Sequence, residues 1–329
     1  MNIVYSSSNS YASVAGVSLY SLLCSNKSSD EINIFIIDNG ISDKNKDKFR
    51  TMCKDFGRSL MFIPIADIEK LAGTTIDIGR WNISTFGRLF EASLLPDYVE
   101  KVIHIDCDTM VMSSLEPLWN IDMDGKIVAG VLECIGDNYK TEIGLSKDDT
   151  YINAGNIMLN LKKIREDNTE EHFRKYINEH SHLSFVDQAV LNSCVSSDEK
   201  LVVDLDYNAY SIIYYIKYEN LKRVKRVTSF YTKAEVTHAV EHPCIVHFTT
   251  CFMDGSRPWI ENNVHPLLSV YLDYKSRSPW ADVPIWKDER NVLKRFAGKM
   301  FRTLPQGFVA WSIGIVHGVI IPFINRLKK

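Results

Sequence analysis

The chain has 329 residues, of which 45% are hydrophobic and 24% charged, and its formal net charge is −3. This composition is ordinary for a globular enzyme with one large or two small domains, and the charge gives no reason to expect a nucleic-acid partner. The seven cysteines are scattered singly, without a Cys-x-x-Cys pair. That pattern argues against a disulfide framework or a zinc site and favours reduced thiols in the cytosol. The first residues lack the basic flank and apolar run of a signal peptide.

In the first third of the chain, short apolar runs alternate with helical patterns. Strands are predicted over residues 2–6, 32–37, 60–65 and 101–105, and helices over 11–24, 44–56 and 85–95. This alternation is typical of an α/β fold with parallel strands, in which ligands bind beyond the carboxyl ends of the strands. The polar loop 6–10 and the acids Asp106 and Asp108 fall at those ends, so we expect them to line one crevice.

The rest of the chain is less regular. Strands are predicted over 157–161 and 244–249, and helices over 162–180 and 186–195. Between them, the segment 202–218 is rich in tyrosine. These rings could form a stacking platform for acceptor sugars, but a tyrosine-rich core or a surface that packs the C-terminal tail would explain them equally well.

Asp106 and Asp108 are the most informative residues of the sequence. They follow the apolar stretch 101–105 and are separated by one residue, so in an extended chain their side chains point to the same side and repel each other. A divalent cation removes that repulsion. Carboxylate oxygens suit magnesium or manganese, which often share their ligands with a substrate phosphate. The pair therefore predicts a metal-bound nucleotide.

Beyond this pair, several short segments follow one another along the chain. They are residues 85–89, 106–108 with 114–119, 151–155 with 160–162, Asp187 with Gln188, and His247 with 257–259. In content and order they resemble glycosyltransferase family 8, the retaining transferases that include bacterial lipopolysaccharide and lipooligosaccharide galactosyl- and glucosyltransferases and glycogenin. The resemblance covers about residues 1–260. It implies an α/β fold of the GT-A type, with a Rossmann-like mixed sheet and flanking helices.

The resemblance also implies a domain of residues 1–284, with a donor-binding half (1–160) and an acceptor-side half (161–284). It assigns Asp106, Asp108 and His247 as the ligands of Mn²⁺ or Mg²⁺, and gives catalytic roles to Arg88, Asp187 and Gln188. The implied donor-binding set is Ser6, Ser8, Tyr11, Arg88, Asp106, Cys107, Asp108, Asn153, Ala154, Gly155, Asp187, Gln188, Gly255 and Arg257.

Within this set, Tyr11 is expected to stack on the base of the nucleotide. Ser8 and Ser10 depart from the resemblance, because family members often carry an acidic residue and an asparagine there, in contact with the uracil ring. Arg257 stands where the family commonly has a lysine for the diphosphate.

Purely structural explanations also fit individual residues. Arg88 could lie on a solvated helix face, Gly155 could serve a tight turn, and Asp187 could cap a helix. His247 could be a core histidine on an apolar strand.

The implied reaction is retaining transfer of glucose or galactose from a UDP-hexose to a hydroxyl of a saccharide or lipid-linked oligosaccharide acceptor. The product would belong to a bacterial surface polysaccharide such as lipopolysaccharide, O-antigen or capsule. Gln188 is a poor nucleophile, which leaves a same-face and a double-displacement route open. Two alternatives are a metal-dependent nucleotidyltransferase, for which the loop 6–10 lacks the usual glycines, and an inactive, membrane-tethered subunit that binds a sugar nucleotide.

The tail of residues 285–329 differs in composition from the rest of the chain. Basic residues recur between 287 and 302, an uncharged run follows over 307–324, and Arg326, Lys328 and Lys329 close the sequence. As a helix, the uncharged run would be roughly 27 Å long, slightly short of the ~30 Å hydrocarbon core of a bilayer. An apolar run between basic segments predicts a peripheral anchor on the cytoplasmic face of the inner membrane. The alternative is a C-terminal helix buried on the domain.

Overall fold

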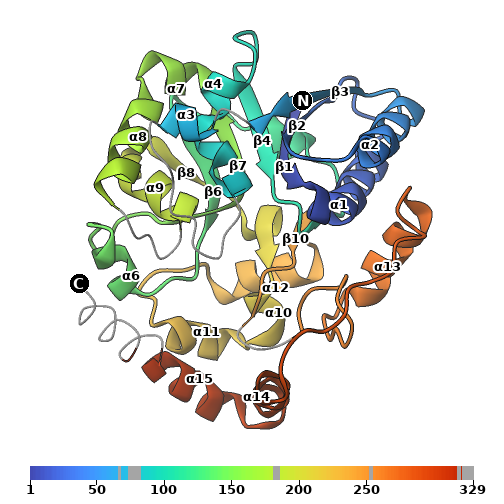
Figure 1. Ribbon diagram of the computed structural model, residues 1–329. Helices are drawn as coiled ribbons and strands as arrows, with labels where there is room; N and C mark the ends of the chain where they lie inside the picture. Colours follow the sequence, from blue (N-terminus) through green and yellow to red (C-terminus); the bar gives the residue numbers. More distant parts are fainter. Residues whose placement is uncertain (66–67, 73–82, 181–185, 252–254, 317–319, 321–329) are drawn as a thin grey trace.

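A seven-stranded mixed sheet forms the centre of the molecule (Figure 1). The computed structural model describes residues 1–65, 68–72, 83–180, 186–251, 255–316 and 320. In spatial order the strands are β3 (Ser59–Pro64), β2 (Asn33–Asn39), β1 (Asn2–Ser8), β4 (Lys101–Ile105), β7 (Ile152–Asn160), β6 (Val128–Leu132) and β8 (Lys200–Val202). The strands from β3 to β4 are parallel, whereas β7 is antiparallel to β4 and β6. The predicted α/β class and the first four predicted strands are confirmed.

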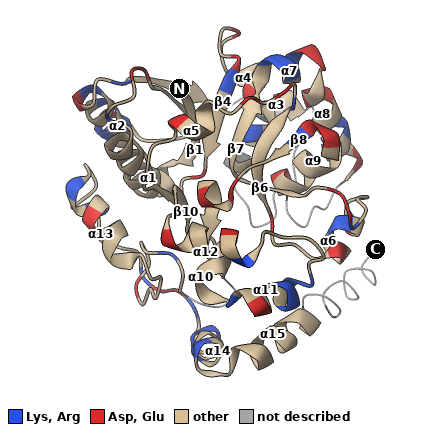
Figure 2. Cartoon of the chain, turned by 180° about the vertical axis from the view of Figure 1, so that it is seen from behind, with Lys and Arg blue, Asp and Glu red and all other residues tan. Residues whose placement is uncertain are grey.

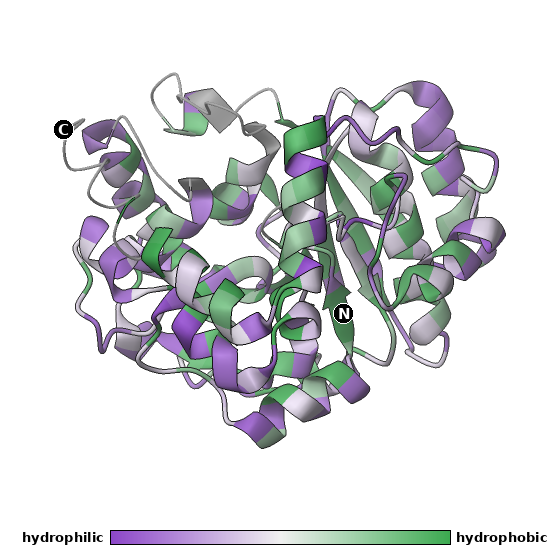
Figure 3. Ribbon diagram, turned by 90° about the horizontal axis from the view of Figure 1, so that it is seen from below, coloured by the Kyte–Doolittle hydropathy of each residue, from purple (hydrophilic) through white to green (hydrophobic). Residues whose placement is uncertain are grey.

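Helices cover both faces of this sheet, because alternate side chains of its strands point to opposite sides. From β1, Ile3 and Tyr5 pack with α1 (Ala12–Ser25) and α2 (Asp43–Asp55), whereas Val4 packs with the helices of the other face. Those helices are η3 (Ile83–Phe90), α4 (Glu91–Leu94), α7 (Leu161–Glu166), α8 (Thr169–Glu179) and α9 (Val186–Cys194). Figure 3 shows hydrophobic residues along the strands between these layers.

A second, three-stranded sheet lies beyond β4 and contains His247, the predicted third metal ligand. It consists of β5 (Thr109–Val111), β10 (Ile245–His247) and β9 (Ala209–Tyr210). β10 is antiparallel to β5, with His247 opposite Thr109. This register brings a residue from late in the sequence next to the turn that holds the two acids. The late strand was predicted from the sequence, but β5 and β9 were not.

Several predicted boundaries are wrong. The strand β1 continues to Ser8, because Ser7 and Ser8 pair with Asp38 and Asn39 of β2, so the expected loop 6–10 begins later. The expected helix 85–95 is mostly 3-10 helix. The expected helix 162–180 is two helices, separated at Asn168, whose φ of 54° is left-handed. The strand β7 begins at Ile152, five residues before its predicted start.

Smaller elements complete the fold below the sheet in the view of Figure 1 and along its edges. The helices are η1 (Asn9–Tyr11), α3 (Ile68–Ala72), α5 (Glu116–Trp119), α6 (Asp137–Glu142), η4 (Ser197–Glu199), η5 (Leu205–Asn208), α10 (Ile212–Tyr215), α11 (Tyr218–Lys225), α12 (Lys233–Glu241), α13 (Leu268–Arg277), α14 (Val292–Thr303) and α15 (Gln306–Ile315).

The helix α15 packs on the tyrosine-rich segment and on α11. The Gln306 side chain accepts a hydrogen bond from the Lys217 N–H (3.0 Å) and donates one to the Tyr215 carbonyl oxygen (2.8 Å). A Cβ on Gly314 would lie 2.5 Å from the Arg223 carbonyl oxygen, so this helix approaches the α11 backbone closely. These contacts fit the alternative that the tyrosine-rich segment packs the tail, and the tyrosines themselves lie in or against the hydrophobic core, which fits the alternative of a tyrosine-rich core.

None of the helices in the described ranges is long and apolar enough to span a bilayer. Part of the predicted anchor, residues 317–319 and 321–324, lies outside the described residues, as do Arg326, Lys328 and Lys329.

Candidate functional site

The two acids lie in the tight turn between β4 and β5, directly after the carboxyl end of β4, where the sequence predicted them. The Asp106 N–H donates to the Gly155 carbonyl oxygen (2.9 Å), and the Phe248 N–H donates to the Asp108 carbonyl oxygen (2.8 Å). These bonds tie the turn to β7 and to the end of β10. Cys107, the residue between the two acids in the sequence, is buried, and its thiol donates to the Ser6 carbonyl oxygen (3.1 Å).

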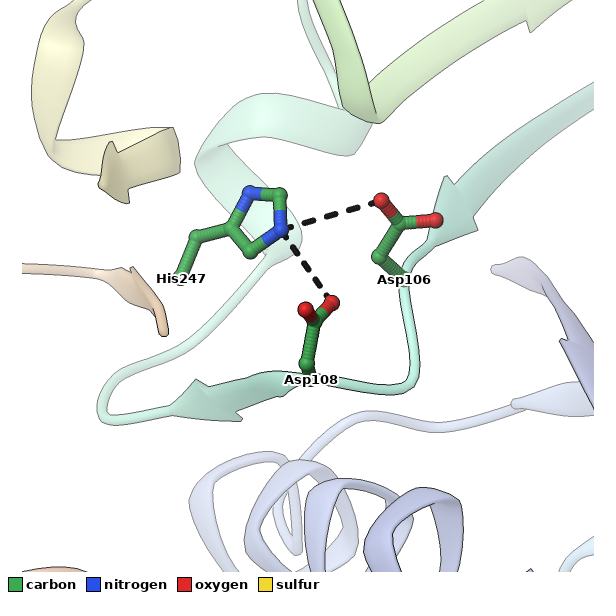
Figure 4. Close-up of side chains that lie close together, drawn as sticks. All are labelled: Asp106, Asp108 and His247. Atoms are coloured by element: carbon green, nitrogen blue, oxygen red, sulfur yellow. Dashed lines mark hydrogen bonds and ion pairs between the residues drawn. The ribbon is translucent and has the colours of Figure 1, made fainter. Parts of the chain in front are cut away.

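Asp106, Asp108 and His247 converge on one point (Figure 4). The Nε2 of His247 lies 3.2 Å from Asp108 Oδ1 and 3.7 Å from Asp106 Oδ2. One ligand atom from each residue lies within 4.8 Å of the others. Two carboxylate oxygens and one imidazole nitrogen, converging at a partly buried point, form a donor set that fits a divalent cation such as Mn²⁺ or Mg²⁺. The structure therefore brings together the three predicted ligands.

Two arginines hold the carboxylate oxygens that do not face His247. Arg88 Nη2 lies 2.6 Å from Asp106 Oδ1, and Arg257 Nη2 lies 3.4 Å from Asp108 Oδ2. Arg88 also reaches Asp187, with its Nε 2.8 Å from Asp187 Oδ2, and donates to the Ala154 carbonyl oxygen. The Arg88 side chain is buried, so the structural alternative of a solvated helix face is wrong. Each acid thus directs one oxygen to an arginine and one towards His247.

The electrostatics of the site follow from burial and these ion pairs. Burial alone would raise the pKa of Asp106, but Arg88, His104 and His247 outweigh it and hold this carboxyl well below its usual range. Burial would lower the pKa of His247, but the adjacent Asp108 and Asp106 raise it. At neutral pH the site therefore holds Asp106 as a carboxylate, the form that binds a cation.

The segment predicted to line the donor sugar faces the start of α9. The Gln188 Oε1 accepts from the Ala154 N–H (3.0 Å), and its Nε2 lies 3.5 Å from the Tyr151 hydroxyl. Burial raises the pKa of Asp187 in spite of its pairing with Arg88. Through Arg88 and Ala154, Asp187 and Gln188 lie beside the acids, as the sequence predicts.

The residues predicted to contact the nucleotide come from the end of β1, from η1 and from the loop after β10. Arg257 links two of them, because its Nη1 donates to the Tyr11 hydroxyl (3.1 Å) while its Nη2 faces Asp108. The Tyr11 ring contacts Trp286 edge-on, with ring centroids 5.2 Å apart. Ser8 and Ser10 bond to each other through their hydroxyls (3.0 Å). A Cβ on Gly255 would lie 2.8 Å from the Asn262 carbonyl oxygen, so this glycine serves close packing of its loop.

Several polar residues behind the site were not predicted from the sequence. The Oδ1 of Asn208, which belongs to η5, lies 3.0 Å from His247 Nδ1. Glu133, at the end of β6, accepts from the Asn153 side chain. His104 and Glu91 form a buried pair next to Asp106. The apolar run 128–132 could have signalled Glu133 as a strand-end acid. Asn208 carries no such signal, because the side chains to which it bonds, those of Asn153, Asn156 and His247, are distant in sequence.

Comparisons with known proteins agree with this architecture. Residues 2–263 match the profile described as glycosyl transferase family 8. General stress protein A of Bacillus subtilis is 25% identical over 85% of this chain and 94% of its own length. The lipopolysaccharide 1,3-galactosyltransferase of Salmonella typhimurium is 21% identical over 91% of this chain and 84% of its own length.

Among solved structures, the galactosyltransferase LgtC in complex with donor and acceptor sugar analogs has a TM-score of 0.71 to this chain. It is 22% identical, over 85% of this chain and 96% of its own. This similarity confirms the GT-A fold predicted from the sequence.

Proposed function

Because this chain belongs to glycosyl transferase family 8, we propose that it transfers glucose or galactose, with retention of configuration, from a UDP-hexose to a hydroxyl of a saccharide acceptor. The convergence of Asp106, Asp108 and His247 on one point, with Arg88 and Arg257 beside them, supports this proposal most directly. The donor set fits a divalent cation, and Mn²⁺ is the ion we propose, with Mg²⁺ as the alternative.

A cation bound by these three residues would supply positive charge at the diphosphate that departs from the sugar. In the proposal, Arg257 adds a second positive charge on the side of the diphosphate that faces Tyr11, because its guanidinium bonds to the Tyr11 hydroxyl. The base of the nucleotide would stack on the Tyr11 ring. A fixed guanidinium stabilises developing negative charge without reorganising at the moment of reaction. Arg88 holds Asp187 at 2.8 Å, so that this carboxylate can orient hydroxyls of the donor sugar.

We propose the same-face route, in which the departing diphosphate takes the proton of the acceptor hydroxyl. The two side chains nearest the proposed donor sugar are poorly suited to act as nucleophiles. Gln188 is uncharged and its Oε1 accepts from Ala154 N–H, while Asp187 is paired with Arg88. An oxocarbenium-like transition state would then be stabilised by surrounding oxygens and would not require a covalent intermediate.

The test is Mn²⁺-dependent hydrolysis of UDP-sugars, measured without acceptor. A screen of UDP-glucose and UDP-galactose would identify the donor. We expect Asp108→Ala to lower the rate by at least about 100-fold, because it removes one ligand of the cation. Asp55→Ala, which changes an exposed aspartate at the end of α2, is the matched control and should behave as wild type. Near-wild-type hydrolysis by Asp108→Ala at saturating Mn²⁺ and donor would overturn the proposal.

We further propose that the acceptor is lipid-linked and belongs to a bacterial surface polysaccharide such as lipopolysaccharide, O-antigen or capsule. The proteins to which the chain is similar include a lipopolysaccharide 1,3-galactosyltransferase. The helices α14 and α15 carry exposed Val292, Leu293, Phe296, Phe308 and Trp311. Figure 2 shows basic residues on α14. An exposed apolar surface next to basic residues suits attachment to the cytoplasmic face of an anionic membrane.

A further inference from the structure

We infer that Asn208 is a positioning residue, which fixes the ring orientation and the tautomer of His247 so that Nε2 presents its lone pair to a cation. The inference rests on the proposed cation site and adds a residue to it. Asn208 is fully buried, and His247 is 4% exposed. Their contact, between Asn208 Oδ1 and His247 Nδ1, is 3.0 Å long.

The hydrogen bonds around Asn208 determine which end of its amide faces the histidine. Its Nδ2 donates to Asn153 Oδ1 (2.8 Å). That oxygen also accepts from the Gly155 N–H (2.9 Å), while the Asn153 nitrogen donates to Glu133. Because a carboxylate can only accept, the Asn153 amide has one orientation, and it imposes one orientation on Asn208.

The Asn208 oxygen therefore faces His247 and can only accept a hydrogen bond from it. In a neutral imidazole, one nitrogen is protonated and the other carries a lone pair. With the proton on Nδ1, the lone pair is on Nε2, the atom that lies 3.2 Å from Asp108 and 3.7 Å from Asp106. A partner that orients the second nitrogen of a ligating histidine is the usual way to fix its tautomer.

Close packing holds the ring in the same place. A Cβ on Gly155 would lie 2.7 Å from His247 Nδ1, so the glycine backbone packs against the ring, where any larger residue would displace it. A second amide, Asn156 Nδ2, donates to Asn208 Oδ1 (2.9 Å) and holds that oxygen in place. The same hydrogen-bond chain continues through Asn153 into the segment proposed to line the donor sugar.

The inference is tested by titrating the full-length protein with Mn²⁺ in the presence of UDP, and following free Mn²⁺ by electron paramagnetic resonance. Asn208→Leu has similar volume but cannot accept a hydrogen bond, and should weaken Mn²⁺ binding about 10- to 100-fold. Asn208→Asp keeps an acceptor for Nδ1 and should lose less than about tenfold, although it loses the bond to Asn153. Asn26→Leu changes another fully buried asparagine, whose side chain bonds to Leu22 and Leu115, and should leave Mn²⁺ affinity unchanged.

Thermal unfolding of all three variants separates positioning from general damage. If the loss of Mn²⁺ affinity follows the loss of stability across the three, or if Asn208→Leu binds Mn²⁺ as wild type does, the inference is overturned and the proposed function stands. If the wild type binds neither Mn²⁺ nor Mg²⁺, the inference and the proposed cation-dependent function are both overturned.

Discussion

At the scale of single residues, the negative charge of Asp106 is balanced in part by His104, which forms a buried pair with Glu91. His104, on β4, is 1% exposed, and its Nε2 lies 3.7 Å from Asp106 Oδ1. Its Nδ1 lies 2.5 Å from Glu91 Oε1. Burial lowers the pKa of His104, but Glu91 and Asp106 together outweigh burial and raise this pKa above its usual value. When His104 is protonated, its positive charge lies between the carboxylates of Glu91 and Asp106 and stabilises both.

A double-mutant cycle on Glu91 and His104 measures this pair. His104→Phe leaves a buried carboxylate without its cation, and we expect it to lower the free energy of unfolding by about 3 kcal/mol. The double variant Glu91→Leu/His104→Phe removes both charges and should recover much of that loss. The pKa of His104 is raised in the folded state, so the pair stabilises fully below pH 6.5 and its contribution is lost as pH rises through the folded pKa. Urea unfolding should therefore give a larger coupling energy at pH 6 than at pH 9; equal values would contradict the charged pair.

Arg88 is the residue whose shape matters most in the site. Its planar fork contacts Asp106, Asp187 and the Ala154 carbonyl oxygen at once, which a lysine ammonium cannot do. We expect Arg88→Lys to lower kcat/KM for UDP-sugar turnover by about 100-fold, because Asp106 and Asp187 would both be misplaced. Arg50→Lys changes an exposed arginine paired with Asp47 and should have no effect. Turnover of Arg88→Lys within a fewfold of wild type would show that its charge alone suffices.

At the scale of elements, the central strands and their helices were predictable because their apolar periodicity is local. The break between α7 and α8 was not, because Asn168 adopts a left-handed conformation that no apolar spacing signals. The short strands β5 and β9 were also missed. Each is three residues or fewer, and each exists because it pairs with β10, which lies far along the sequence.

The contact between α1 and the segment after α13 gives a test at this scale. A Cβ on Gly16 would overlap the ring of Trp280 and would lie 2.6 Å from its Cη2. Trp280 is 1% exposed and also packs on Phe49, with ring centroids 4.7 Å apart. We expect Gly16→Ala to lower the free energy of unfolding by about 1–3 kcal/mol, because the ring must move. Gly307→Ala, in α15, is the matched control, since nothing lies within 4 Å of its added Cβ. It should be neutral or slightly stabilising, and an equal effect of the two changes would contradict the packing argument.

At the scale of the whole molecule, the described tail both packs on the domain and exposes apolar side chains. The helix α15 buries Val309, Ala310 and Gly314 and docks on α11, as the buried-helix alternative required. Phe308 and Trp311 of the same helix remain 55% and 61% exposed. One helix can therefore serve as a structural element and as part of a membrane-facing surface.

Vesicle binding tests that surface. With anionic phosphatidylglycerol vesicles, the double variant Phe296→Asp/Trp311→Asp should bind at least about tenfold more weakly than wild type, since both rings are exposed and would be buried in the interface. Tyr98→Asp, which changes a side chain that is 74% exposed on another part of the molecule, should bind as wild type. Unchanged binding of the double variant, or wild-type binding that is equal on neutral vesicles, would contradict the proposed attachment.

The sequence by itself determined the α/β class and the strand-end acids with their need for a cation, because strand and helix periodicity is local and two acids one residue apart need positive charge nearby. The identity of the residues that converge with them came from the resemblance of short sequence segments to glycosyltransferase family 8. Only the tertiary structure decided that Arg88 is buried against both Asp106 and Asp187, and that Asn208 faces the second nitrogen of His247. These contacts join segments 18 to 99 residues apart. Their partners are set by the order and register of the strands, which depend on packing between distant parts of the chain.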